Sequence, residues 1–189
     1  MFFSRSLFLT FVMATYNVET KIWEGPKVPY NFPNETSLGA EVLKKLSETP
    51  ERVFQISHHD GFSLTCHQAR LNSIRIAQNL TKLGFGKGDV FGFLCDNGKN
   101  FPVTLFASLL IGAPVNPIDP RFKKDEIKNM FGQTVPKLVF CEAGAFETTK
   151  AALTELDNSA MIVTFGDKIG GATYIEDLLA PTGNEDSFE

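Results

Sequence analysis

The sequence predicts an α/β fold: a partial doubly wound, largely parallel sheet with βαβ crossovers, preceded by an extended arm, a helix and a hairpin. Short apolar runs of strand length recur along the chain, at residues 90–95, 137–141 and 161–165. Longer segments with a helical spacing of apolar residues separate these runs. Strands that alternate with helices in this way favour a parallel sheet, because each crossover helix returns the chain to the same edge.

The unit at residues 83–122 is the clearest of these. The run 90–95 is apolar on both faces, which is typical of a strand covered on both sides. The run 101–111 is apolar nearly all round and long enough for a helix. Its polar positions recur every fourth residue and form one narrow stripe: Asn100, Thr104 and Ser108. Such a helix needs protein on most sides, so we expect part of it, or the sheet face beside it, to be unusually exposed in this chain.

Two elements precede that unit. Ser37 is a helix N-cap, and the helix that it begins runs to about Leu46. A hairpin then joins 54–57 to 62–64, and its turn places Gly61 where a positive φ is required.

A longer helix follows the hairpin. Thr65 and Gln68 have the spacing of a capping box. The helix that they begin runs to Leu83, and Gly84 stands at its C-terminal cap. It therefore leads directly into the strand at 90–95.

Helices also separate the later strands. We predict one from Lys123 to Phe131, stopped by Gly132, and one over 146–156. Thr173 and Glu176 are spaced as a second capping box, for a short helix ending near Ala180.

The domain organisation follows from these elements. Trp23 is the expected anchor of the arm, which is rich in proline and aromatic residues. The four predicted parts are an apolar extension or signal-like segment at 1–14, the extended arm at 15–36, the α/β part at 37–180 and a loose polar tail at 181–189. A second interpretation takes Met13 as the true start of the protein.

Composition excludes several functions. The net charge of −4 gives no basic surface for nucleic acid. No apolar segment is long enough to span a membrane as a helix. The 3 cysteines cannot complete a disulfide framework, and Cys95 and Cys141 end apolar runs, which indicates buried, reduced thiols in an intracellular protein. If residues 1–14 act as a signal, the protein is instead secreted or membrane-anchored.

Three motifs resemble functional sites but do not have the context that such sites require. Gly84–Gly88 follows a helix and opens a strand, whereas a phosphate loop follows a strand and opens a helix, so it predicts a structural turn. The histidines at 58, 59 and 67 with Cys66 match no metal-binding spacing. No serine lies in a nucleophile-elbow context. We therefore assign no catalytic and no metal-binding residue.

Polar residues that follow two of the predicted strands are the remaining candidates. Asp96 and Asn97 follow the first strand, and Asn116 and Asp119 lie at the end of the second. Open parallel sheets bind ligands at this edge. The same residues are also common in ordinary turns, where they bond to their own backbone. Both readings stay open.

The order of several segments resembles the N-terminal region of the AMP-forming adenylating enzymes, in particular the luciferase-like and 4-coumarate–CoA-ligase-like acyl-CoA synthetases. The segments that carry the resemblance are Thr20–Pro26, Arg75–Leu80, Leu83–Val90, Leu110–Pro117, Pro136–Cys141 and Asp177–Pro181. The resemblance implies a carboxylic acid activated by ATP and Mg²⁺ to an acyl-adenylate and then transferred to coenzyme A. It also implies a cytoplasmic or peroxisomal protein.

No family catalytic residue maps onto this chain. The family's Ser/Thr/Gly-rich phosphate loop, ending in Pro-Lys-Gly, would begin shortly after Asp186. We therefore expect a truncated synthetase that is inactive alone and binds no cofactor, whose partner is the missing remainder of the domain or a full-length relative. The alternatives are a non-catalytic interaction module and a self-sufficient small-ligand-binding α/β domain.

Overall fold

A computed structural model describes residues 14–25, 35–58 and 61–188, and the chain divides into two units, 1–35 and 36–189. In the first unit, β1 (Thr15–Asn17) and β2 (Ile22–Glu24) form an antiparallel hairpin. The structure thus differs from the expected extended arm, because the Asn17 side chain accepts hydrogen bonds from the backbone N–H groups of Glu19 and Thr20 and closes a turn. Within this unit Trp23 contacts the Tyr16 ring, and its role as an anchor stays a prediction.

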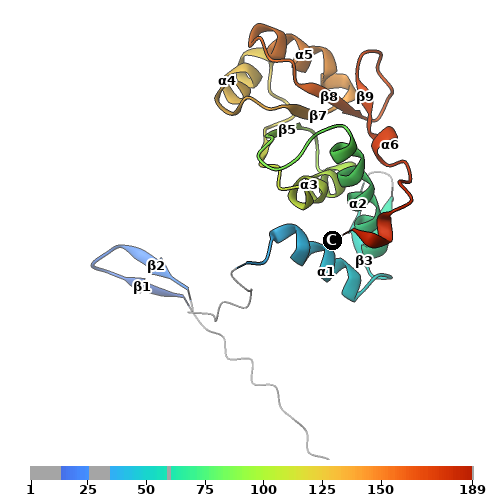
Figure 1. The fold of residues 1–189 in the computed structure, drawn as a ribbon. Coiled ribbons are helices and arrows are strands. Elements are labelled where there is room, and N and C mark those ends of the chain that lie inside the picture. The colour runs from blue at the N-terminus through green and yellow to red at the C-terminus, as the bar shows by residue number, and fades with distance from the viewer. Residues whose placement is uncertain (1–13, 26–34, 59–60, 189) are drawn as a thin grey trace, which may run out of the picture. The chain divides into compact units, whose positions relative to one another are not determined.

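The second unit contains the predicted sheet, and the α/β class is confirmed. Its five strands are parallel and lie in the order β6-β5-β7-β8-β9 (Figure 1). Their bounds are β5 Phe91–Leu94, β6 Val115–Pro117, β7 Leu138–Glu142, β8 Met161–Phe165 and β9 Thr173–Tyr174.

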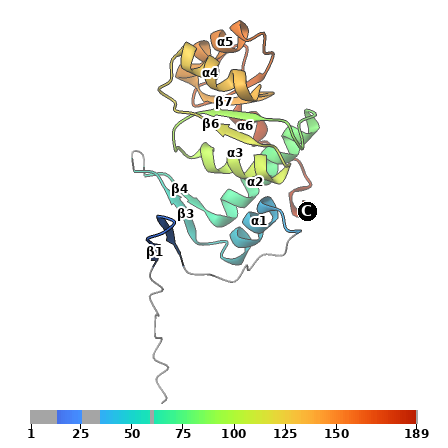
Figure 2. The same ribbon diagram turned by 90° about the vertical axis from the view of Figure 1, so that its left-hand side faces the viewer.

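Helices cover both faces of this sheet. α4 (Lys124–Thr134) and α5 (Phe146–Glu155) lie on one face (Figures 1 and 2). α2 (Cys66–Lys82), α3 (Asn100–Leu110) and α6 (Ile175–Leu178) lie on the other. The core is accordingly divided by the sheet into two clusters. The larger cluster contains a row of rings on three adjacent strands: Phe91, Phe93, Phe140 and Phe165.

α1 (Leu38–Glu48) packs on α2 and α3, with the hairpin of β3 (Val53–Ile56) and β4 (Ser63–Thr65) beside it. The predicted helix caps are confirmed: Ser37 Oγ accepts from Ala40 N at 3.1 Å, and Thr65 and Gln68 form the capping box. Gly61 has φ +68°, as the hairpin turn requires.

The polar stripe of α3 is buried, and its outer face is half-buried. Thr104 Oγ1 donates to Asn100 O and Ser108 Oγ to Thr104 O, both at 2.8 Å, so these hydroxyls are satisfied inside the helix. We expected unusual exposure of this helix or of the sheet face beside it. No residue of α3 is fully exposed, but its outward apolar residues are only half-buried, and exposed apolar side chains nearby belong to β3 and to Leu38 of α1.

Two predicted helix boundaries are wrong. α4 continues through Gly132 to Thr134 and is capped by Val135 in a left-handed conformation. Gly132 instead lets α5 approach, since a Cβ there would lie 3.3 Å from Leu156 Cδ2. The second is the capping box expected at Thr173 and Glu176. The backbone N–H of Tyr174, one residue later, donates to Asp177 Oδ2 instead.

The tail expected to be loose is docked on α2 as far as residue 188. Arg75 Nε donates to Glu185 Oε1 at 2.9 Å, and Gln78 Nε2 donates to Asn184 O at 2.9 Å. Residues 185–187 form a single 3₁₀ turn there, as residues 143–145 do before α5. Asn79 Nδ2 donates to the carbonyl oxygens of Leu178 and Ala180, just before the tail.

The pH dependence of stability tests whether the ion pair of Arg75 and Glu185 holds the tail on α2. Arg75 and two backbone N–H groups lower the pKa of Glu185 from 4.5 to about 2. A carboxyl with a depressed pKa stabilises the fold above its unfolded pKa, and that contribution is lost as pH falls through the folded value. We expect Glu185→Gln to lower the urea midpoint at pH 7 and to match the unmodified chain near pH 2. A difference that stays constant from pH 7 to 2 would contradict the docked pair.

Candidate functional site

The carboxyl ends of β5, β6, β7 and β8 meet at one edge of the sheet because these strands are parallel. The chain leaves β5 for β6 on one side and then crosses to β7 on the other. Such a reversal of direction is a topological switch point, where open α/β sheets bind ligands. This edge is therefore the geometrically favoured site.

Two small hollows lie along that edge. The first, of about 240 Å³, is at the ends of β5 and β6. Its lining includes Asp96, Asn97, Asp119, Cys95, Phe101 and Ile118. Three of the four residues predicted from the sequence are thus brought together; their ligand role stays a prediction.

Arg121 forms an ion pair with Asp119, one of the carboxylates that line this hollow. Its Nε and Nη2 donate to Asp119 Oδ1 and Oδ2 at 2.9 and 2.6 Å. The backbone N of Arg121 also donates to Oδ1 at 2.9 Å, and together these bonds lower the pKa of Asp119 to about 2. Asp119 therefore stays ionised and cannot act as a general acid near neutral pH.

Asn116 is not part of the hollow. It lies within β6, and its Nδ2 donates to Thr134 Oγ1 at 2.8 Å, at the end of α4. The sequence places it near a strand end but does not show to which side its amide turns. Its observed contact is a brace between β6 and α4.

The second hollow, of about 230 Å³, lies at the switch point itself and was not predicted. Its lining includes Ser57, Lys99, Asn100, Glu142, Phe165 and Gly166. Burial raises the pKa of Glu142, and the Lys99 ammonium lies 5.9 Å from the centre of the Phe62 ring. The signal that could have found it is the position of Glu142 as the last residue of the third parallel strand.

The other motifs stay structural. Gly84–Gly88 joins α2 to β5, with Gly84 and Gly88 at positive φ and the N–H of Gly86 donating to Asp89 Oδ2 at 2.9 Å. Among residues 14–25, 35–58 and 61–188, no group of three potential metal ligands gathers. Within the same ranges, no helix is both long and apolar enough to cross a bilayer.

The described part of the chain does not fit a nucleoside triphosphate. The edge holds three carboxylates, from Asp96, Asp119 and Glu142, which repel phosphate. The cations beside them are Lys99 and Arg121, and Arg121 is paired with Asp119.

The fold and its switch-point edge define an open, parallel α/β sheet, and comparison with known proteins gives the family. The profile of the AMP-binding enzyme family matches residues 42–178, so the chain belongs to that family. The predicted resemblance to adenylating enzymes is therefore confirmed.

Individual relatives agree with this assignment. The chain is 28% identical over 119 residues to a 4-coumarate–CoA ligase of Humulus lupulus and 23% identical over 110 residues to a luciferin 4-monooxygenase of Photuris pensylvanica. It spans only 22% and 20% of their lengths and is itself covered to 63% and 57%. The structure of the luciferase-like enzyme of the mealworm Zophobas morio superposes with a TM-score of 0.78 and 27% identity, over 84% of this chain and 37% of that one.

Proposed function

We propose that this chain supplies the N-terminal α/β part of an ATP-dependent acid–CoA ligase. The whole enzyme would convert a carboxylic acid, ATP and coenzyme A to an acyl-CoA, AMP and pyrophosphate. The observation that carries the proposal is the family match over residues 42–178 on a sheet that superposes with a luciferase-like enzyme. An acyl-CoA ligase acting on fatty acids is one member of this class.

We further propose that residues 1–189 alone catalyse no adenylation. Their two edge hollows are small and carry carboxylates, which supports this view. ATP, Mg²⁺ and coenzyme A would be bound by other parts of a complete enzyme. The role of this part is then mechanical: its buried sheet holds the carboxyl edge in place for the remainder.

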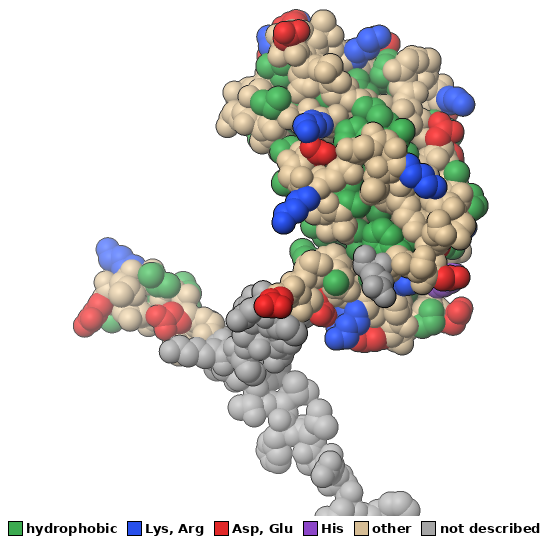
Figure 3. Space-filling view, in the orientation of Figure 1, with side chains coloured by type: hydrophobic (Ala, Val, Ile, Leu, Met, Phe, Trp, Pro, Cys, Tyr) green, Lys and Arg blue, Asp and Glu red, His purple; other side chains and the backbone are tan. Residues whose placement is uncertain are grey.

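The partner of this part would be the remainder of an adenylating domain or a full-length relative. Exposed apolar side chains on β3 support this: Val53, Phe54 and Ile56 are exposed, Ile56 to 71%. The Phe54 ring packs edge-on against the Phe106 ring of α3, with centroids 5.7 Å apart. Figure 3 shows further hydrophobic side chains at the surface in the middle of this unit. This surface also favours the second candidate, a non-catalytic module, which co-elution with a full-length relative would support.

The free cysteines favour a reducing compartment for this protein. All three cysteines are buried and free, and burial raises the pKa of Cys141 to about 12. Such thiols are inert and need no oxidising environment. We place the protein in the cytoplasm or a peroxisome, the latter by resemblance only.

A chimera tests the proposed function. In the 4-coumarate–CoA ligase of Humulus lupulus, the segment equivalent to residues 42–178 is replaced by this chain's segment, and formation of 4-coumaroyl-CoA is measured. We expect a folded chimera with reduced but detectable activity. The matched control carries Gly92→Ala in the grafted segment and should lose both thermal stability and activity, because that change disrupts the sheet core.

A further inference from the structure

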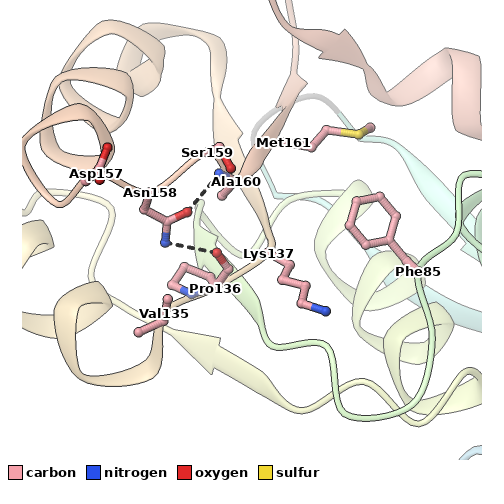
Figure 4. A pocket seen from close by; sticks show the side chains of 9 residues that line it. All are labelled: Phe85, Val135, Pro136, Lys137, Asp157, Asn158, Ser159, Ala160 and Met161. Carbon is pink, nitrogen blue, oxygen red and sulfur yellow. Dashed lines mark hydrogen bonds between the residues drawn. The ribbon is translucent and has the colours of Figure 1, made fainter.

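The amino edge of the sheet, opposite the switch point, carries a larger hollow. Its volume is about 480 Å³, against about 240 and 230 Å³ for the two hollows at the carboxyl edge. Its walls come from three connections: Phe85 after α2, Val135–Lys137 between α4 and β7, and Asp157–Met161 between α5 and β8 (Figure 4). This volume lies in the range of sites for small organic ligands.

The polar wall of the hollow is fixed by one amide. Asn158 Nδ2 donates to Pro136 O at 3.1 Å, and Asn158 Oδ1 accepts from Ala160 N at 2.8 Å (Figure 4). The side chain thereby ties the connection before β8 to the connection before β7. A wall held in this way is formed before any ligand arrives, which reduces the cost of binding.

The opposite wall is apolar and also fixed. Phe85 lies across the hollow from Asn158, and Met161 is beside it (Figure 4). The Phe85 ring is held edge-on against the buried Phe91 ring, with centroids 5.7 Å apart and an interplanar angle of 85°. An aromatic face and a thioether are favourable contacts for a flat apolar group.

Val135, at the rim, ends α4 in a left-handed conformation, and its N–H donates to Phe131 O at 2.8 Å. Its φ and ψ are 46° and 64°, in the left-handed region that β-branched residues rarely occupy. Its side chain is 63% exposed. Asp157, across the hollow, is also left-handed, with φ 51°. Both residues follow the C-termini of helices, and the backbone hydrogen bonds of these caps fix the rim of the hollow.

One exchangeable cation belongs to the hollow. Lys137 Nζ lies 2.5 Å from Asp89 Oδ1, but its side chain is 67% exposed. An ion pair so exposed is weak, and an incoming anion can replace the carboxylate. The Asp89 and Asp157 carboxylates close by disfavour a ligand with more than one negative charge.

We propose that this hollow binds a small organic monoanion with a flat apolar body, such as an aromatic carboxylate. The apolar body would lie against Phe85 and Met161, and the carboxylate would accept hydrogen bonds from Lys137 Nζ. The site is separate from the carboxyl edge of the sheet, and the proposal does not depend on the proposed enzyme function.

The test is a titration of the ¹⁵N-labelled 189-residue chain with 2-naphthoate, followed by amide chemical shifts. We expect saturable shifts that are largest at Val135, Lys137 and residues 158–161. Lys137→Met should weaken binding about tenfold or more, since a charged hydrogen bond is lost. Neutral 2-naphthamide should bind the unmodified chain weakly and should not distinguish it from the Lys137→Met variant.

Two further variants complete the test. Lys168→Met removes an exposed lysine that follows β8 at the other edge and should leave the affinity unchanged. Ser159→Trp places a large ring at the exposed mouth and should abolish the shifts while the thermal midpoint is retained. The proposal is overturned if the shifts centre on Asp96 or Glu142, if they do not saturate, or if Lys137→Met or Ser159→Trp binds like the unmodified chain.

Discussion

Replacement of Phe140 by alanine is expected to lower the free energy of unfolding by about 3–5 kcal/mol. Phe140 is fully buried in β7, and its ring lies 4.9 Å from that of Phe93 and 5.8 Å from that of Phe165. Truncation removes this shared contact and leaves a cavity in a sheet covered on both faces, where the backbone cannot easily collapse. Urea unfolding followed by far-ultraviolet circular dichroism measures the loss.

A second phenylalanine provides the control. Phe54 is 39% exposed on β3, so Phe54→Ala should cost clearly less, about 1–2 kcal/mol, because its ring is only partly removed from water. Equal losses for the two variants would contradict the assignment of the core to the row of rings on the parallel sheet.

Gly92→Ala is expected to cost about 2–3 kcal/mol although it adds a single methyl group. A Cβ at this position in β5 would lie 2.7 Å from Phe131 Cζ and 3.2 Å from Val139 Cγ2. Phe131 is fully buried on α4, so its ring has no free space into which to turn. The strand and the helix must therefore move apart. Thermal and urea unfolding of the variant measure the effect.

The double variant Gly92→Ala, Phe131→Leu isolates the cause. If the clash with the ring is responsible, the smaller side chain should recover part of the loss, and the two substitutions should be non-additive. Additive losses would show that Gly92 matters for another reason, such as the conformation of the strand.

Local signals predicted most of the fold. The Thr65–Gln68 capping box and the Ser37 cap were read correctly because a cap depends on residues three positions apart. β8 has the predicted bounds, since both of its faces are apolar. Gly132 misled the prediction because its small size serves the contact with Leu156, a residue far along the chain.

The candidate site depends on strand order, which local patterns do not contain. Asp96 and Asp119 were placed together because consecutive parallel strands end at one edge. Glu142 was missed, because its place beside Lys99 requires that β7 lie next to β5 rather than next to β6. Asn116 shows the remaining difficulty: the direction of one amide is set by its partner, Thr134, on a different element.

The tail illustrates the same point for a polar segment. Residues 181–189 show no apolar periodicity, so their sequence predicts a loose segment. Their docking combines polar contacts to α2, such as the pair of Arg75 and Glu185, with packing of Phe188 against the core. Such contacts join positions 110 residues apart, and nothing near either residue announces them.

The measurement that tests the central claim most directly is the formation of 4-coumaroyl-CoA, compared between the 4-coumarate–CoA ligase chimera and the 189-residue chain alone. If this chain supplies the N-terminal part of an acid–CoA ligase, the folded chimera forms the product and the chain alone forms none. A folded chimera without activity, or product formed by the chain alone, would contradict the account.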